Sequence, residues 1–164
     1  MFYLELFRAL QDEQVEYVLV GGLAVNLHGV ERATMDVDLV LAMDDPNLKR
    51  FLRAARRMEL RPSLPVALES LCDASQLDQW AREKHMIAFA LRAPAPALPT
   101  VDVIVRPVVS FRQMHRNRIS KDVGGVALHI ASIDDLVSLK TGTGRQKDAS
   151  DIEALRMLQR MGDA

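Results

Sequence analysis

VGGLAVNLHGVERATMDVDLVL, residues 20–41, is the stretch of sequence from which the fold can be inferred. The apolar run YVLV, residues 17–20, overlaps the start of this stretch at Val20 and predicts a buried strand. Gly21 and Gly22 interrupt that strand. The next residues predict a short helix closed by Gly29, because glycine best tolerates the left-handed conformation past a helix end. Residues 36–42 are rich in β-branched and aliphatic side chains and predict a second strand. We therefore expect strand, short helix and strand in direct succession.

Outward from this segment, the apolar spacing alternates between the periods of helices and strands. It predicts helices over 2–13, 47–58, 110–116, 132–140 and 147–160, and strands over 86–92, 100–107, 117–121 and 126–131. The part between Pro62 and His85 predicts either one broken helix or two. We interpret residues 1–164 as a single domain with a core at about 15–131, followed by C-terminal helices at about 132–160.

The bulk composition narrows the class of protein. A chain of 164 residues can bury a hydrophobic core without disulfides, and its single cysteine, Cys72, cannot form an internal one. We therefore expect a reducing, cytoplasmic setting. The sequence lacks the pattern of a signal peptide and any run of ~20 apolar residues, so no membrane association is expected. A net charge of −1 excludes a global basic field that would attract nucleic acid.

Gly21 and Gly22 stand between a strand and a helix, where a phosphate can be bound. Two residues without a Cβ let the backbone approach a ligand, and a helix N-terminus offers unpaired N–H groups. The alternative is a plain turn, since glycine commonly punctuates loops.

Three aspartates stand out in apolar surroundings: Asp36 and Asp38 at the start of one strand and Asp102 within another. Alternate residues of a strand share a face, so Asp36 and Asp38 are expected to point the same way. If the two strands are neighbours, the three carboxylates can bind divalent ions for a phosphoryl displacement. Oxygen ligands favour Mg²⁺ or Mn²⁺. The alternative is a solvated strand edge.

The order strand–GG–helix–R–x–T–x–D–x–D–strand, with a later aspartate in an apolar strand, resembles the DNA polymerase β-like nucleotidyltransferase superfamily. It looks most like the AbiEii-type branch of bacterial toxin–antitoxin and phage-defence systems. The segment LVSLKTGTGRQKDASDIEAL, residues 136–155, is similar to the segment that follows the catalytic core in such relatives. Many members have Gly-Ser where this chain has Gly21-Gly22, and the Gly-Gly form is typical of the AbiEii-like and antibiotic-modifying branches.

The resemblance implies an α+β fold with a mixed β-sheet flanked by helices. It implies that Asp36 and Asp38 bind the metals that hold the triphosphate, and that Asp102 completes the second metal site and helps to activate the acceptor hydroxyl. Gly21 and Gly22 then contact the phosphates. The reaction moves a nucleoside monophosphate from an NTP to an acceptor hydroxyl or phosphate and releases pyrophosphate.

Several basic and polar residues are further candidates for nucleotide binding. Arg32 can meet a phosphate, and Thr34 can hold the loop or a carboxylate. Lys140 and Lys147 lie on either side of the TGTG break, where a cation can neutralise the triphosphate. For all four residues the alternative is ordinary solvation. The same choice, an RNA contact or a solvated face, applies to a basic cluster made of Arg112, His115, Arg116, Arg118 and Lys121.

Three functional hypotheses follow. The first is an active nucleotidyltransferase in a toxin–antitoxin or defence setting that modifies RNA or protein and has an antitoxin partner. The second is a small antibiotic nucleotidyltransferase, which is less favoured because the sequence has no acidic cluster suited to a polycationic drug. The third is an inactive nucleotide-binding or partner-binding module on the same fold, since a fold alone does not secure a function.

Overall fold

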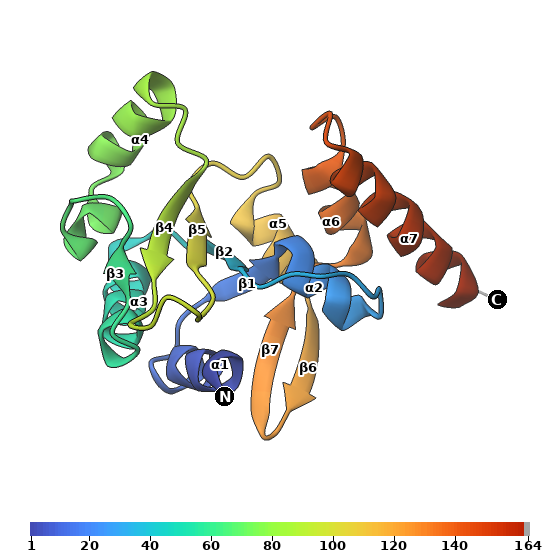
Figure 1. The fold of residues 1–164 in the computed structure, drawn as a ribbon, viewed down its shortest axis with the longest axis horizontal. Helices are drawn as coiled ribbons and strands as arrows, with labels where there is room; N and C mark the ends of the chain where they lie inside the picture. The colour runs from blue at the N-terminus through green and yellow to red at the C-terminus, as the bar shows by residue number, and fades with distance from the viewer. Residues whose placement is uncertain (163–164) are drawn as a thin grey trace.

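A mixed seven-stranded sheet with the order β3-β4-β5-β2-β1-β7-β6 organises the computed structural model, which describes residues 1–162. The pairs β2–β5 and β1–β7 are parallel, and the other pairs are antiparallel. The sheet and the helices around it confirm the expected α+β class (Figure 1). The strands are β1 (Tyr17–Val20), β2 (Val37–Leu41), β3 (Arg61–Pro62), β4 (Ala88–Arg92), β5 (Val101–Ile104), β6 (Ile119–Val123) and β7 (Val126–Ile130).

Four of the helices form two packed pairs beside this sheet. α1 and α3 lie together near the N-terminus, whereas α6 and α7 pack side by side at the other end of the molecule (Figure 1). The helices are α1 (Phe2–Asp12), α2 (Gly21–His28), α3 (Asp45–Arg57), the 3₁₀ helix η1 (Leu68–Cys72), α4 (Ala74–Glu83), α5 (Phe111–Asn117), α6 (Ile133–Lys140) and α7 (Gln146–Gly162). None of these helices is long and apolar enough to cross a membrane.

Local sequence explains where the helices begin and end. Ser132 caps α6 by accepting a hydrogen bond from the backbone N–H of Asp135 at 3.2 Å, as its position in the sequence predicts. Gly29 ends α2 in the left-handed conformation, with φ 115°. Asp44 caps α3 by accepting from the N–H of Asn47. Asn47 itself is fully buried and ties α3 to the backbone of Glu16.

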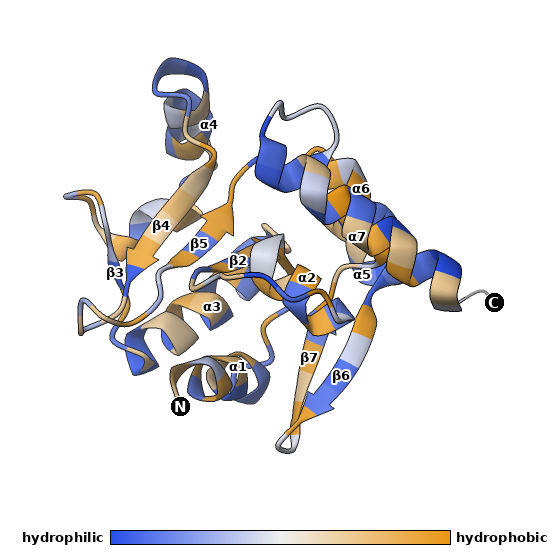
Figure 2. Cartoon of the chain, turned by 45° about the vertical axis from the view of Figure 1, so that its right-hand side comes forward, coloured by the Kyte–Doolittle hydropathy of each residue, from blue (hydrophilic) through white to orange (hydrophobic). Residues whose placement is uncertain are grey.

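One face of the sheet packs into the core and the other carries polar groups. In β2, Val37, Leu39 and Leu41 are buried, while Asp38 between them lies on the other face and is half-buried. The apolar character of β4 and β5 contrasts with the hydrophilic outer strand β6 (Figure 2). Strand alternation therefore separates the core from the face on which the functional candidates lie.

Four details of the sequence-based expectation are corrected. Strand β2 begins at Val37, so Asp36 precedes it. The reason is that β5, the parallel partner of β2, begins at Val101 opposite Val37, and β1 pairs no further than Asp38. Helix α2 begins at Gly21, two residues before the expected start at Leu23, although the strand ends before the two glycines as predicted. Strand β5 ends at Ile104 and not near residue 107, because β4 begins opposite it.

The fourth correction concerns β6, which covers Ile119–Val123 and so begins and ends about two residues later than expected. Its hairpin with β7 turns at Gly124 and Gly125, both with positive φ.

The uncertain stretch after residue 62 contains two short helices, η1 and α4, separated at Asp73. Asp73 caps α4 by accepting from the N–H of Gln76.

Candidate active site

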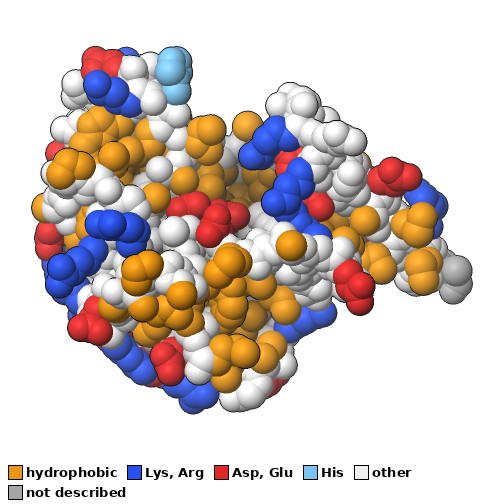
Figure 3. Space-filling model, viewed as in Figure 1, with side chains coloured by type: hydrophobic (Ala, Val, Ile, Leu, Met, Phe, Trp, Pro, Cys, Tyr) orange, Lys and Arg blue, Asp and Glu red, His pale blue; other side chains and the backbone are white. Residues whose placement is uncertain are grey.

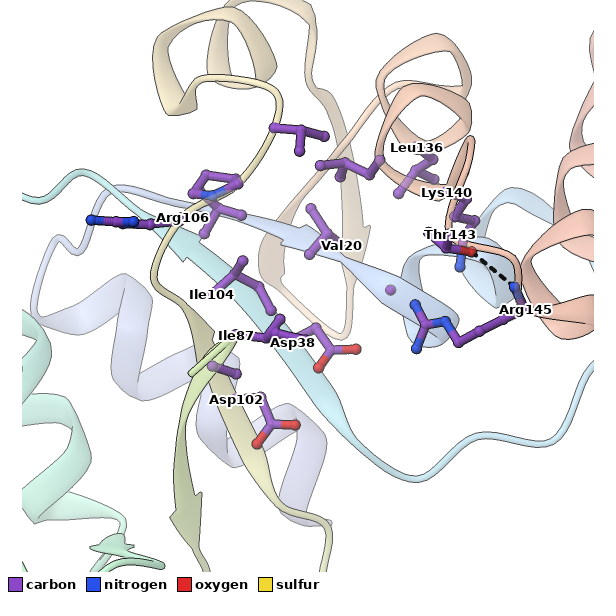
Figure 4. A pocket seen from close by; sticks show the side chains of 16 residues that line it. Val20, Asp38, Ile87, Asp102, Ile104, Arg106, Leu136, Lys140, Thr143 and Arg145 are labelled. Atoms are coloured by element: carbon purple, nitrogen blue, oxygen red, sulfur yellow. Dashed lines mark hydrogen bonds between the residues drawn. The ribbon is translucent and has the colours of Figure 1, made fainter. Parts of the chain in front are cut away.

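Two carboxylates lie side by side on the open face of the sheet. Asp38 of β2 and Asp102 of β5 are partners in the parallel ladder, so their side chains leave neighbouring strands on the same face. Strand spacing puts their backbones about 4.8 Å apart. Figure 4 shows the two carboxylates next to each other at the edge of a cavity. The two strands are therefore neighbours, which is the condition that the sequence set for a shared metal site.

Asp36 lies one step beyond this pair, outside the strand and exposed to solvent. Its carboxylate accepts a hydrogen bond from the Thr100 hydroxyl at 2.9 Å, and the Val37 N–H donates to the Thr100 carbonyl. Thr100 therefore fixes the loop in front of β2 to the start of β5. The sequence did not single out this threonine, because nothing in its local pattern shows that it faces Asp36.

The electrostatics of the three aspartates favour a cation. Burial, together with the charges of Asp102 and Asp36, raises the pKa of Asp38 to about 6. Burial and then the charge of Asp36 raise the pKa of Asp102. Carboxylates that repel one another in a partly dry site are stabilised by a positive charge between them.

Asp38 and Asp102 can bind a magnesium or manganese ion without a complete cage of protein ligands. Within residues 1–162, no group of three or more His, Cys, Asp or Glu side chains is arranged to enclose a metal ion. Mg²⁺ does not require such a cage, because it usually binds one or two carboxylates, water and the phosphates of its substrate. Asp38 and Asp102 supply a pair of this kind, and Asp36 is near enough to influence both pKa values.

Gly21 and Gly22 are required by close approaches within the site. Gly21 has a φ of 72°, and a Cβ on it would lie 2.0 Å from Oδ2 of Asp38. A Cβ on Gly22 would lie 2.8 Å from the hydroxyl of Thr34 and 3.1 Å from Cζ of Arg32. Neither position accepts a larger residue without movement of a site side chain, so the two glycines do more than form a turn.

Basic groups face the carboxylates across the cavity. Lys140 at the end of α6, with Thr143 and Arg145 in the loop after it, lies on the opposite side of Asp38 from Asp102 (Figure 4). The positive charge of Lys140 acts on Asp38 and opposes the rise of its pKa. In the space-filling view, acidic side chains lie at the centre of the hollow, and basic side chains border it on the α6–α7 side (Figure 3).

Two buried acids of α7 hold these cations in place. Lys140 Nζ lies 3.3 Å from Oδ1 of Asp148 and 3.0 Å from Oδ2 of Asp151. Arg145 pairs with Asp148 at 2.8 Å. Asp151 also pairs with Arg32 from the loop before β2. The sequence predicted both acids only as ordinary first-turn residues of a helix, since local pattern does not reveal burial.

The cavity has a volume of about 600 Å³, which is in the range of small-molecule sites. Gly21, Asp38, Asp102 and Lys140 line it. The other nucleotide-binding candidates lie elsewhere: Gly22, Arg32 and Thr34 form the layer behind Gly21, Asp36 lies at the rim, and Lys147 is exposed on the first turn of α7. Arg106 and Thr143, which the sequence did not single out, also line the cavity.

The sequence pattern of a family described as "nucleotidyltransferase of unknown function (DUF6036)" matches residues 4–162. The chain belongs to this nucleotidyltransferase family. A search of curated proteins finds no match. The family match supports the superfamily that the sequence resembles, and the AbiEii-type branch stays a prediction.

Two solved structures share the fold of this DUF6036 nucleotidyltransferase. An antigenic nucleotidyltransferase-like protein from Paracoccidioides brasiliensis matches with a TM-score of 0.57 and 20% identity, over 95% of this chain and 72% of that chain. ANT(2")-Ia, solved in complex with adenylyl-2"-tobramycin, matches with a TM-score of 0.55 and 10% identity, over 97% of this chain and 93% of that chain. At such identities the likeness concerns the fold alone.

Proposed function

We propose that this chain transfers a nucleoside monophosphate from an NTP to an acceptor hydroxyl or phosphate, with Mg²⁺ or Mn²⁺ bound by Asp38 and Asp102. The observation that carries the proposal is the register pairing of these two aspartates opposite Lys140. Asp36, which the Thr100 hydroxyl holds at the rim, is the third carboxylate of the site. The family match supports nucleotidyl transfer as the general chemistry.

Different residues of the cavity have different roles in this proposed reaction. Gly21 and the start of α2 leave room for the triphosphate, and Lys140 and Arg145 neutralise the charge of the pyrophosphate as it leaves. The bound divalent ion would polarise the α-phosphate and lower the pKa of the attacking hydroxyl. The acceptor oxygen bonds to the α-phosphorus, and the bond to the bridging oxygen of pyrophosphate breaks. Asp102, on the far side of Asp38, receives the proton of the acceptor.

The acceptor in this proposal is a macromolecule, RNA or protein, in a toxin–antitoxin or phage-defence setting with an antitoxin partner. The setting rests on the sequence resemblance. An antibiotic acceptor is the alternative, and the shared fold with ANT(2")-Ia keeps it open. Against it stands the cavity lining, whose only acids are Asp38 and Asp102 among the described residues, so a polycationic drug has no further acidic group to bind.

Transfer of label from α-labelled NTPs tests the proposal. The purified protein is incubated with each common NTP, Mn²⁺ or Mg²⁺, and either total RNA or cell-extract protein. We expect metal-dependent label on one macromolecule, and at least a 100-fold loss in Asp38→Asn and Asp102→Asn. Transfer by these variants at the wild-type rate would refute the assignment.

Two controls make the result specific. Glu153→Gln removes an exposed carboxylate of α7 that faces away from the cavity, and it should keep full activity. A parallel screen of aminoglycosides by mass spectrometry tests the small-molecule alternative. A mass gain of one nucleotide on a drug, with no label on RNA or protein, would establish the alternative instead.

A further inference from the structure

Two arginines lie on the same open face of the sheet as Asp38 and Asp102. Arg92 of β4 is two residues beyond Ala90, which pairs with Asp102, so Arg92 and Asp102 lie on the same face. Arg61 of β3 is the ladder partner of Arg92. On the open face the arginine pair therefore lies two residues along the strands from the level of Asp102 and Asp38, toward the start of β5.

Arg61 and Arg92 lack partners of their own. Both side chains are exposed. Among residues 1–162, neither arginine has an ion-pair partner or a side-chain hydrogen bond. Glu59 lines the same hollow without pairing with either arginine. Like charges directly opposite each other on neighbouring strands destabilise the ladder. An anion between the two guanidinium groups would relieve this repulsion, and arginine binds phosphate through a two-pronged contact.

These arginines border a second hollow of about 560 Å³ that extends to Thr100 at the start of β5. Thr100 lines this hollow and donates its hydroxyl hydrogen bond to Asp36. Strand geometry places the Cα of Arg92 about 8 Å from that of Asp102, a distance that an arginine side chain and one phosphodiester unit span together. Thr100 therefore links this hollow to Asp36, although the hollow and the first cavity share no lining residue.

The side on which the hollow lies assigns it to the acceptor. In a phosphoryl displacement the attacking and leaving oxygens stand roughly in line on opposite sides of the phosphorus. The leaving pyrophosphate faces Lys140 and Arg145, on the α6 side of Asp38. The attacking oxygen must then come from the Asp102 side, where β4 and β3 follow in the sheet. Basic side chains border the central acidic patch on the β3–β4 side as well (Figure 3).

We propose that Arg61 and Arg92 bind a backbone phosphate of a single-stranded RNA acceptor and so position its end at Asp102. The inference rests on the proposed function and deepens it by naming the acceptor class. RNA is favoured over protein because an unpaired arginine pair suits a phosphate that recurs at every step of a strand. A polycationic drug would be repelled by the same pair.

Binding is measured first, independently of catalysis. The probe is a fluorescent single-stranded RNA of about 12 nucleotides, and its anisotropy is followed between about 50 and 200 mM salt. Arg61→Gln/Arg92→Gln should bind about tenfold more weakly than the wild-type protein, and its log–log salt slope should fall by about 0.7, because the pair neutralises one phosphate of a single strand. Arg112→Gln/Arg116→Gln on α5 is the matched comparison, since it removes two exposed arginines of the basic cluster that the sequence offers as the other RNA contact, and both lie away from both hollows.

The outcomes separate this inference from the proposed function. Failure of the wild-type protein to bind the RNA, an unchanged slope in the Arg61/Arg92 variant, or a larger loss in the α5 variant would each overturn it. Equal binding of a poly-glutamate peptide, lost in the same variant, would show a general anion site and overturn the RNA assignment. If RNA binding behaves as expected but no NTP-derived label is ever transferred, the RNA-binding role of the two arginines holds, whereas the proposed function and the role of the RNA as its acceptor fail.

Discussion

Gly21 lies so close to Asp38 that a Cβ at this glycine would stand 2.0 Å from Oδ2 of the carboxylate. The same residue has a φ of 72°, begins α2, and follows the last residue of the strand that pairs with β2. One position thus combines a left-handed backbone, a helix start and direct contact with the proposed metal ligand. The reason for glycine here is the position of Asp38 as much as the turn itself.

The first prediction separates these two roles. Gly21→Ala should lower activity at least 100-fold, because its methyl group displaces the Asp38 carboxylate. It should also destabilise the protein by more than the 1–2 kcal/mol that a left-handed non-glycine residue costs. Nucleotidyl transfer and urea unfolding are the measurements.

Gly125→Ala, in the β6–β7 hairpin and outside the cavity lining, is the matched control for this prediction. Gly125 has a φ of 83°, but nothing lies within 4 Å of the Cβ that alanine would add. This variant should show the backbone cost alone, about 1–2 kcal/mol, with activity retained. Equal losses of activity in the two variants would contradict the steric role of Gly21.

The second prediction concerns the metal-free protein. Burial, with the charges of Asp102 and Asp36, raises the pKa of Asp38 to about 6. The native state therefore holds this proton more tightly than the unfolded state, and the stability contributed is complete below the unfolded pKa and is lost as the pH rises through about 6. In a chelator, Asp38→Asn should be more stable than the wild-type protein at pH 8, by about 1–2 kcal/mol.

Added metal reverses the comparison. Mn²⁺ binds the native state through Asp38 and so raises the stability of the wild-type protein at pH 8 more than that of Asp38→Asn. Urea unfolding at pH 4 and pH 8, with and without Mn²⁺, gives the free energy of unfolding of the wild-type protein and of Asp38→Asn under each condition. Glu153→Gln serves as the reference variant. A stability difference between Asp38→Asn and the wild-type protein that does not change with pH would contradict the assigned pKa.

Much of the fold follows from the sequence because it depends on local periodicity. The strand ending at Val20, the helix closed by Gly29 and the Ser132 cap are all found where the pattern places them. The ends of strands were less accurate, because a strand ends where its partner ends. Strand β2 excludes Asp36 for this reason, since its parallel partner β5 begins at Val101, opposite Val37.

The candidate site depends more on contacts that are remote in sequence. The Asp38–Asp102 pairing was inferred as a condition, and the β2–β5 ladder fulfils it. The burial of Asp148 and Asp151 could not be inferred, because an acid in the first turn of a helix has the same local pattern whether it is exposed or paired with Lys140. The Arg61–Arg92 pair likewise requires knowledge of which strands are neighbours.

The third prediction concerns Asp151 as a positioning residue. It is 4% exposed and pairs with both Lys140 and Arg32. Asp151→Asn leaves two buried cations with weaker compensation, so we expect a loss of about 3 kcal/mol in unfolding free energy. Because Lys140 then loses its orientation toward the leaving pyrophosphate, kcat should fall more than the KM for NTP rises.

The reference for this variant is Asp134→Asn. Asp134 pairs with Arg156 at 2.7 Å in an exposed ion pair, and such pairs contribute about 0–1 kcal/mol. Its stability and KM should therefore stay close to the wild-type values. If Asp151→Asn proves as mild as Asp134→Asn, the buried network does not hold Lys140 in place.

The fourth prediction compares the two lysines that the sequence proposed for nucleotide binding. Lys140 lines the cavity and its charge acts on Asp38, whereas Lys147 is exposed and outside the cavity lining. Lys140→Gln should lower kcat/KM for NTP about 100-fold, as expected when a cation is removed from a transition-state charge. Lys147→Gln should stay within about twofold, because an exposed charge is screened by solvent.

Lys140→Arg separates charge from folding in this comparison. It keeps a cation between Asp148 and Asp151, so its stability in urea should remain nearer to the wild-type value than that of Lys140→Gln. Its kcat/KM should recover only in part, because the planar guanidinium cannot reproduce the compact ammonium of lysine. A greater loss of NTP turnover in Lys147→Gln than in Lys140→Gln would move the phosphate site from the cavity to the first turn of α7.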